Sequence, residues 1–236
     1  MNELQTKYKT EIEELVEACH RCAALGYVTS SGGNLSYRLE ENLILITPTK
    51  TPKRQMRFED ICFIDNEGNV VYAPEGKKPT GETPFHVRIM HMRKDVRAIV
   101  HAHPPVLTGF AIAGTNLMER PFLPEPILEV GPMLNVAYAT PLSDELSENF
   151  DAVIHKSNGF LMQNHGALVC NVNDITEAVE HMEMMEAMAK SICVAKLLGN
   201  ANEIPTEYVR DLDNVIRIRN LKMPGSGEGS LEELYK

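Results

Sequence analysis

The apolar positions of the chain follow a helical period in several stretches. Between residues 3 and 25, apolar side chains recur every three to four positions, and Gly26 follows as a typical helix end. A longer stretch of the same period begins at the capping signature of residues 173–177 and ends at Leu198. We therefore predict helices over residues 3–25, 84–93, 106–113, 143–156, 173–198 and 205–221.

Other stretches alternate with the period of a strand or are short and wholly apolar. Residues 61–64 and 69–72 flank the turn sequence 65–68, which indicates a hairpin. Residues 121–132 are rich in proline and are expected to be irregular, with short extended pieces. The predicted strands are residues 35–39, 43–47, 61–64, 69–72, 95–101, 135–140, 160–163 and 167–170.

The rest of the composition describes a single acidic domain. A net charge of −10 argues against nucleic acid or an anionic membrane as a partner. No apolar run approaches about 20 residues, and the charged N-terminus lacks a signal-peptide core, so we expect a cytoplasmic protein. Five scattered cysteines fit reduced thiols, with Cys19 and Cys22 as packing residues. Residues 1–222 are expected to form one domain, followed by a flexible C-terminal tail over residues 223–236.

Two histidines at the end of a buried strand are the first candidate for chemistry. His101 and His103 are two positions apart, so a strand presents both on one face. His165 lies in a glycine turn between two predicted strands and is the candidate third ligand. Three histidines with an open fourth position suit Zn²⁺ or a similar divalent ion. The alternative is a strand-end pair bonded to the backbone. The remaining histidines are expected at the surface or as caps: His20, His86, His91, His155 and His181.

Glu82 and three polar loops complete the candidate site. Glu82 precedes a predicted helix, where it is either a capping carboxylate or a general base beside the metal. The loops Ser30–Asn34, Thr47–Lys50 and Thr80–Gly81 offer hydroxyls and free backbone N–H groups. Together they are candidates for an anion-binding nest, to which Lys50 adds a point charge. Each loop alone is also consistent with an ordinary turn.

The order of these motifs resembles the class II aldolase/adducin-head family, which includes L-fuculose-phosphate aldolases. The resemblance covers roughly residues 5–200. It implies a three-layer α/β/α fold with a central, mostly antiparallel sheet, and a cyclic homotetramer with active sites at subunit interfaces. It also implies the following roles: His101, His103 and His165 as metal ligands, Glu82 as ligand of the substrate-free metal and then acid/base, and Gly33, Asn34, Thr49, Thr80 and Gly81 as phosphate-binding positions.

The function implied is a metal-dependent aldolase that cleaves a ketose 1-phosphate to dihydroxyacetone phosphate and an aldehyde. The metal is zinc, or another divalent ion such as manganese or cobalt. Thr80-Gly81 replaces the serine pair common in fuculose-phosphate aldolases, and Lys50 replaces a glycine. Their active-site tyrosine is absent, so the aldehyde pocket is changed and would suit a 5-deoxypentulose or methylthiopentulose phosphate.

Glu125 leaves the reaction open. Its spacing from His101 resembles that of the catalytic glutamate in methylthioribulose-1-phosphate dehydratases, a sister branch that lacks a counterpart of Glu82. Glu125 is otherwise an exposed loop carboxylate. A dehydratase, a decarboxylase of 3-oxo sugar-acid phosphates and a metal-free interaction module of the adducin-head type therefore remain alternatives. Pentulose-phosphate 4-epimerases also belong to the family, but they tend to carry aspartate at the position of Glu82.

Overall fold

A computed structural model of the chain describes residues 2–227 and 229–235. Within these residues, the strands lie between an N-terminal pair of helices and three C-terminal helices, with further helices and three short 3₁₀ helices among them. The elements are α1 (Glu3–Lys7), α2 (Lys9–Ala24), β1 (Asn34–Glu40), β2 (Leu43–Ile46), η1 (Lys53–Gln55), η2 (Phe58–Asp60), β3 (Cys62–Ile64), β4 (Val70–Tyr72), α3 (Thr83–Met92), β5 (Ala98–Ala102), α4 (Pro105–Ala113), η3 (Leu117–Glu119), α5 (Pro124–Glu129), β6 (Met133–Val136), α6 (Asp144–Glu148), β7 (Gly159–Met162), β8 (Gly166–Asn171), α7 (Ile175–Leu197), α8 (Thr206–Arg219) and α9 (Leu231–Leu234).

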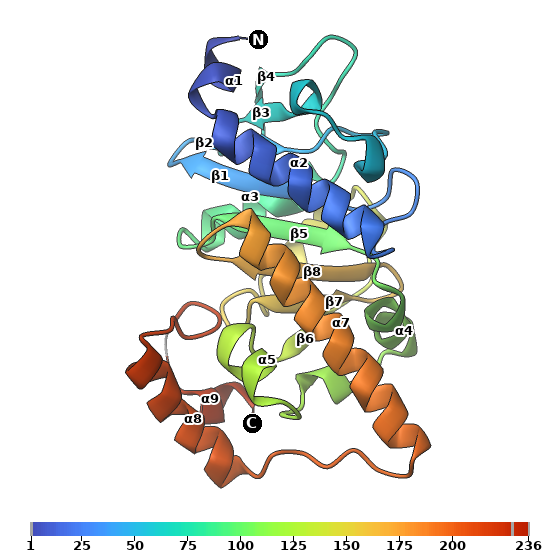
Figure 1. Cartoon of the computed structure of the whole chain (residues 1–236), viewed down its shortest axis with the longest axis vertical. Helices are drawn as coiled ribbons and strands as arrows, with labels where there is room; N and C mark the ends of the chain where they lie inside the picture. Colours follow the sequence, from blue (N-terminus) through green and yellow to red (C-terminus); the bar gives the residue numbers. More distant parts are fainter. Residues whose placement is uncertain (1, 228, 236) are drawn as a thin grey trace.

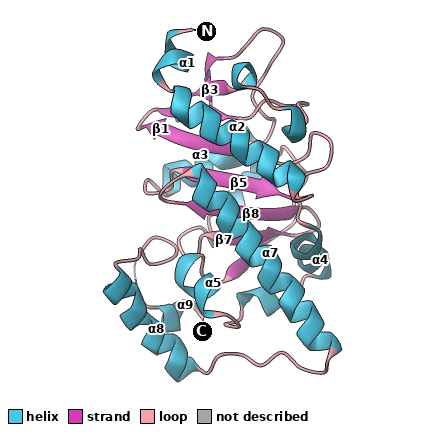
Figure 2. Ribbon diagram, in the orientation of Figure 1, coloured by secondary structure: helices cyan, strands magenta, loops and turns pink. Residues whose placement is uncertain are grey.

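The strands form one eight-stranded sheet in the order β4-β3-β2-β1-β5-β8-β7-β6. Every neighbouring pair is antiparallel except β6 and β7, which are parallel. Helices α2 and α7 cross one face of this sheet, and α3 lies behind it (Figures 1 and 2). The predicted three-layer α/β/α fold with a mostly antiparallel sheet is therefore confirmed.

Two apolar clusters, one on each face of the sheet, follow the two-residue period of the strands. In β5, Val100 packs toward α2 and α7, whereas Ile99 packs toward α3. In β2, Leu45 likewise belongs to the cluster on the side of α2 and α7, and Ile44 belongs to the cluster on the side of α3. Because both faces are covered, the central strands read as continuous apolar runs rather than as alternating ones.

Three of the segments predicted as helical or irregular differ from the structure, and the strand predicted over residues 135–140 is found at Met133–Val136. The first helix is divided at Tyr8 into α1 and α2. The proline-rich stretch contains α5, because Pro124 and Pro126 lie in its first turn, where no backbone N–H is needed. Helix α6 is shorter than residues 143–156, because the chain then passes through turns that place Phe150 and Ile154 in the core.

Part of the C-terminal segment packs on the rest of the chain. Leu231 is fully buried in a third apolar cluster that joins α5, α8 and α9. Gly225 has a φ of +74°, and a Cβ there would lie 2.5 Å from the His155 carbonyl oxygen. Because position 225 is glycine, the backbone of this segment lies directly against the backbone of residues 155–157. Packed residues are therefore found on both sides of residue 222.

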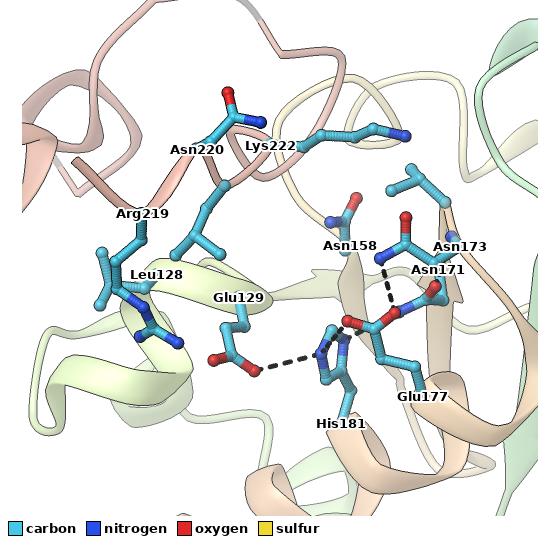
Figure 3. A pocket seen from close by; sticks show the side chains of 12 residues that line it. Leu128, Glu129, Asn158, Asn171, Asn173, Glu177, His181, Arg219, Asn220 and Lys222 are labelled. Atoms are coloured by element: carbon cyan, nitrogen blue, oxygen red, sulfur yellow. Dashed lines mark hydrogen bonds and ion pairs between the residues drawn. The ribbon is translucent and has the colours of Figure 1, made fainter. Parts of the chain in front are cut away.

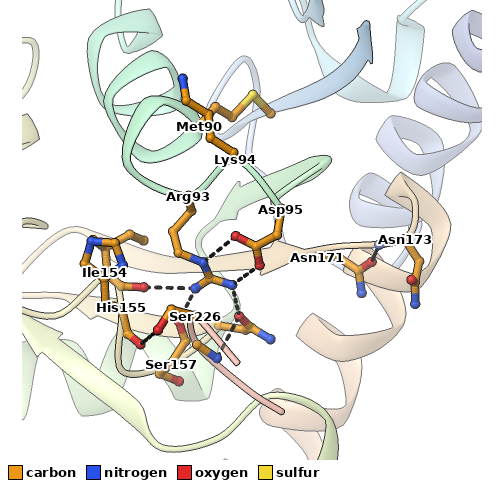
Figure 4. Close-up of polar contacts among 12 residues, drawn as sticks. Met90, Arg93, Lys94, Asp95, Ile154, His155, Ser157, Asn171, Asn173 and Ser226 are labelled. Atoms are coloured by element: carbon orange, nitrogen blue, oxygen red, sulfur yellow. Dashed lines mark hydrogen bonds and ion pairs between the residues drawn. The ribbon is translucent and has the colours of Figure 1, made fainter. Parts of the chain in front are cut away.

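Arg93 is the buried charge that organises this end of the domain (Figure 4). Its guanidinium pairs with both oxygens of Asp95 at 2.8 and 2.7 Å. It also donates to the carbonyls of Ile154 and Ser157 and to Asn158 Oδ1. Asn158 Oδ1 accepts the backbone N–H of Gly225 as well. One side chain, 1% exposed, therefore ties α3 to the turn before β7 and to the C-terminal segment.

No helix in the described part of the chain has both the length and the apolar character that crossing a membrane requires.

We predict that Arg93→Lys lowers the free energy of unfolding by about 2–3 kcal/mol, because an ammonium group cannot satisfy all of these buried acceptors. Urea denaturation measures the change. The matched control is Arg88→Lys, which breaks the half-exposed bidentate pair of Arg88 with Asp151 and should cost less than about 1 kcal/mol. Equal effects of the two substitutions would contradict the role given to Arg93.

Candidate metal centre and active site

His101 occupies the end of β5, at the middle of the sheet. It lies opposite Asn34 of β1 and opposite Leu168 of β8. Its Nδ1 is 3.0 Å from the carbonyl oxygen of Ala167. Because a carbonyl only accepts, Nδ1 carries the proton and the Nε2 lone pair is left free.

His103 and His165 reach the same point from different segments. The backbone N–H of His103 donates to the Tyr27 carbonyl at 2.7 Å, which holds the chain just after β5. His165 lies in the turn between β7 and β8, where Asn164 has a φ of +54°. One ring nitrogen from each of the three histidines lies within 4.8 Å of the others. The structure therefore brings together the three histidines that the sequence pointed to.

The cluster has the donor set of a divalent-cation site. Within the part of the chain that the structure describes, His101 Nε2 and His103 Nε2 are buried and have no hydrogen-bond partner. Burial, together with the neighbouring His165 and Lys53, lowers the pKa of His103 to about 4. The pKa of His101 lies well below its usual value, for the same reason and because of the other two rings. Neutral imidazoles with unused lone pairs are the form that binds zinc-like ions, so these residues fit a divalent metal.

Glu82 faces the cluster from the start of α3. Its Oε2 lies 3.5 Å from His101 Nε2, and its Oε1 lies 3.4 Å from His165 Nε2. The residue occupies the N-cap position, but its side chain makes no capping hydrogen bond. Of the two interpretations of Glu82, the geometry favours a carboxylate beside the metal site over a helix cap.

Gly33 and Asn34 lie against the histidines. Gly33 has a φ of +68°, and a Cβ would meet the His101 carbonyl oxygen at 2.7 Å, so only glycine permits this approach. Asn34 Nδ2 donates to Glu82 Oε2 at 2.6 Å. Asn34 was expected to bind phosphate, but in the structure its amide nitrogen is directed at Glu82.

The other two expected phosphate loops lie side by side. Thr49 N–H donates to the Lys78 carbonyl at 2.9 Å, and Thr80 N–H donates to the Thr47 carbonyl at 3.1 Å. Thr49 and Lys50 are exposed. Gly81 is overlaid by Leu142, whose side chain a Cβ on Gly81 would meet at 2.8 Å. The two loops thus form a joined, accessible surface next to Glu82.

Lys53 also lies at this site, although no sequence motif identified it as a functional residue. It is 1% exposed, and its ammonium donates to the Ser31 carbonyl at 3.3 Å. Burial lowers the pKa of Lys53, whereas the nearby Cys19, Cys22 and Glu82 raise it. A buried ammonium without a paired carboxylate among the described residues gives the Ser30–Asn34 loop a positive field. No local signal distinguishes Lys53 from the surface lysines around it.

Glu125 lies apart from this centre. It is exposed in the first turn of α5, which packs on α7 and α8. Within the described residues, no hydrogen bond or ion pair links Glu125 to the histidines or to Glu82. A single protomer therefore does not bring the two candidate carboxylates together.

A separate polar cavity of about 290 Å³ lies at the other end of β8 (Figure 3). His181, expected at the surface, is buried there, 3.4 Å from Glu129 and 3.7 Å from Glu177. Arg219 and Lys222 of the C-terminal segment line the same cavity. The cavity shares no residue with the histidine cluster.

Comparison with known proteins agrees with this geometry. The sequence profile of the "Class II Aldolase and Adducin N-terminal domain" matches residues 13–193. The chain is 32% identical over 193 residues to a 3-oxo-tetronate 4-phosphate decarboxylase of Haemophilus influenzae, covering 80% of this chain and 89% of that protein. It is 33% identical over 188 residues to an L-fuculose phosphate aldolase of Methanococcus maripaludis, covering 80% of this chain and 98% of that protein.

Solved structures show the same relationship. An L-fuculose 1-phosphate aldolase superposes with a TM-score of 0.76 at 26% identity, covering 88% of this chain and 96% of that one. The resemblance seen in the order of the motifs is confirmed by sequence profile, by identity and by fold. The chain belongs to the class II aldolase and adducin N-terminal domain family.

Proposed function

We propose that this protein is a metal-dependent aldolase that reversibly cleaves a ketose 1-phosphate to dihydroxyacetone phosphate and an aldehyde. The observation that carries the proposal is Glu82, whose carboxylate lies within 3.5 Å of two of the three clustered histidines. A scaffold module has no physical need for three convergent imidazoles and a facing carboxylate. Candidate substrates are L-fuculose 1-phosphate and 5-deoxypentulose or methylthiopentulose 1-phosphates.

His101, His103 and His165 are proposed to hold the ion, with Zn²⁺ the first choice and Mn²⁺ or Co²⁺ the alternatives. Such an ion, when bound, polarises the substrate carbonyl and stabilises the negative charge that bond cleavage creates.

The chain's own residues supply the remaining steps of the proposed reaction. The loops at Gly33, Thr49, Lys50, Thr80 and Gly81 bind the phosphate and hold C3 of the ketose in register. Glu82 accepts the proton of the C4 hydroxyl, the C3–C4 bond breaks, and its electron pair enters the enediolate of dihydroxyacetone phosphate. Glu82 then delivers a proton to C3 of that enediolate, and removes it in the direction of synthesis.

A decarboxylase is the second candidate, favoured by the similarity to the Haemophilus influenzae protein of that name. Loss of carbon dioxide from a 3-oxo-tetronate 4-phosphate breaks the C1–C2 bond and leaves the same three-carbon enediolate. The two reactions thus share the metal, the phosphate loops and the proton carried by Glu82. They differ only in whether an aldehyde or carbon dioxide departs.

We further propose that the protein works as a homotetramer with sites at subunit interfaces. Supporting this, large apolar side chains are exposed on α4 and the end of α7: Ile112, Val194, Leu197 and Leu198. In such a tetramer, the exposed Glu125 of one protomer would reach the active site of a neighbouring protomer.

The substrate that is consumed and the second product, an aldehyde or carbon dioxide, distinguish the two reactions. The metal-loaded enzyme is incubated with ketose 1-phosphates and, separately, with a 3-oxo-tetronate 4-phosphate, and dihydroxyacetone phosphate is measured by coupled reduction. We expect dihydroxyacetone phosphate and an equal amount of aldehyde from at least one ketose 1-phosphate. Release of carbon dioxide together with no cleavage of any ketose 1-phosphate would assign the decarboxylase instead.

Glu82→Gln should lower kcat by about 10²- to 10⁴-fold, because an amide cannot carry the proton. Metal content, measured by elemental analysis, should stay near that of the wild type. The control is Glu59→Gln, an exposed carboxylate distant in the chain, which should leave kcat unchanged. Near-normal turnover by Glu82→Gln removes this residue from the mechanism.

Metal dependence is tested by dialysis against a chelator. Activity should fall to background and return with Zn²⁺, Mn²⁺ or Co²⁺. His103→Ala should bind much less metal, whereas His155→Ala, which removes an exposed histidine, should bind as the wild type does. A wild-type protein that takes up no divalent ion would exclude every enzymatic function considered above.

A further inference from the structure

Behind Glu82 lies a row of buried polar side chains that the proposed reaction does not use. Asn34 Oδ1 is 2.5 Å from His86 Nε2, and His86 Nδ1 is 2.7 Å from Ser36 Oγ. Ser36 and His86 are 0% exposed, and Asn34 is 4% exposed. His86 was expected at the helix surface, yet it lies at the centre of this row.

The backbone explains why these residues meet. Asn34 and Ser36 are two positions apart in β1, so both side chains project from the same face. Glu82 and His86 are four positions apart at the start of α3, so they lie on one side of that helix. The face of β1 and the side of α3 pack together, and Phe85 fills the space against His86 and His101.

Each hydrogen bond in the row has only one direction that satisfies its neighbours. An ionised Glu82 can only accept, so Asn34 must present its amide nitrogen to it. The Asn34 oxygen then faces His86, which must carry its proton on Nε2. His86 Nδ1 is left as an acceptor, and the Ser36 hydroxyl donates to it.

His86 is neutral in this row. Burial lowers its pKa to about 3, so only one ring nitrogen carries a proton. The position of that single proton determines which way the Asn34 amide is turned.

We propose that Ser36, His86 and Asn34 are positioning residues that orient the Glu82 carboxylate, with the Ser36 hydroxyl selecting the His86 tautomer that the orientation requires. Asn34 holds Glu82 Oε2 and leaves Oε1 as the oxygen that exchanges the proton with substrate. This inference rests on the proposed role of Glu82 as proton carrier. It gives Asn34 a contact with Glu82 in addition to its predicted place at the substrate phosphate.

Removal of the Ser36 hydroxyl is expected to change the tautomer of His86. In Ser36→Ala, nothing donates to His86 Nδ1, so the tautomer with its proton on Nδ1 becomes populated. The Nε2 lone pair then faces the Asn34 oxygen, and the amide turns to relieve the repulsion. The turned amide presents its oxygen to the Glu82 carboxylate and displaces it.

The kinetic test separates positioning from phosphate binding. Ser36→Ala should lower kcat about tenfold with KM unchanged, because the phosphate loops are intact and the lost hydrogen bond acts only on proton transfer. Asn34→Ala should also lower kcat more than it raises KM. A rise in KM with kcat unchanged for Asn34→Ala returns that residue to the phosphate site and overturns the proposal.

The matched control is Ser157→Ala, which removes another buried serine hydroxyl with two hydrogen bonds, far from Glu82. It should reduce thermal stability to a similar extent and leave kcat unchanged. Ser36→Thr, which keeps a hydroxyl, should recover most of kcat. Equal kcat in Ser36→Ala and wild type would also overturn the proposal.

A second measurement does not depend on activity. Nitrogen NMR of metal-free protein with labelled histidine reports which ring nitrogen of His86 is protonated, and His86→Gln identifies its signals. We expect a proton on Nε2 in the wild type and a mixture of tautomers in Ser36→Ala. If His86 carries its proton on Nδ1 in the wild-type protein, the proposed directions of the hydrogen bonds are wrong, whether or not the protein has lyase activity. A protein with the expected tautomer but no lyase activity would contradict the proposed function alone.

Discussion

The active centre depends on the position of β5 between β1 and β8. This strand is hydrogen-bonded on both edges, and its register sets Asn34, His101 and Leu168 in one row across the sheet. A shift of one residue in either pairing would turn His101 to the opposite face, away from α3 and Glu82. Gly33 and Gly166 protect this arrangement, because any side chain there would collide with the backbone at the end of β5.

Desolvation sets the chemical state of the site. His101 is buried and His103 is half-buried beside His165 and Lys53, so a positive charge on the ring of His101 or His103 is opposed by the low-dielectric surroundings and by its neighbours. His101 and His103 are therefore kept neutral, and Lys53 places a buried positive charge beside them. Unpaired imidazole nitrogens suit a divalent cation, and a buried ammonium group suits an anion.

Much of this arrangement could be predicted from the order of motifs, and some could not. Buried strands, the long helix α7 and the three histidines have strong local or family-level signals. The burial of His86 and Lys53 has no such signal, because it follows from how α3 packs on the sheet and how η1 packs on α2. The glycine-rich C-terminal segment has the composition of a linker, yet Leu231 finds an apolar pocket between α5 and α8 that no local pattern reveals.

The separation of the site residues along the chain has a consequence for how the protein comes to be active. Asn34 and Glu82 are 48 residues apart, and His101 and Ala167 are 66 apart. No short fragment contains the cation-binding set, and loop closure must be completed on both sides of β5 before it exists. The three histidines thus come together only when β8 has joined the sheet beside β5. A chain that is still being synthesised lacks the complete set until that segment has left the ribosome.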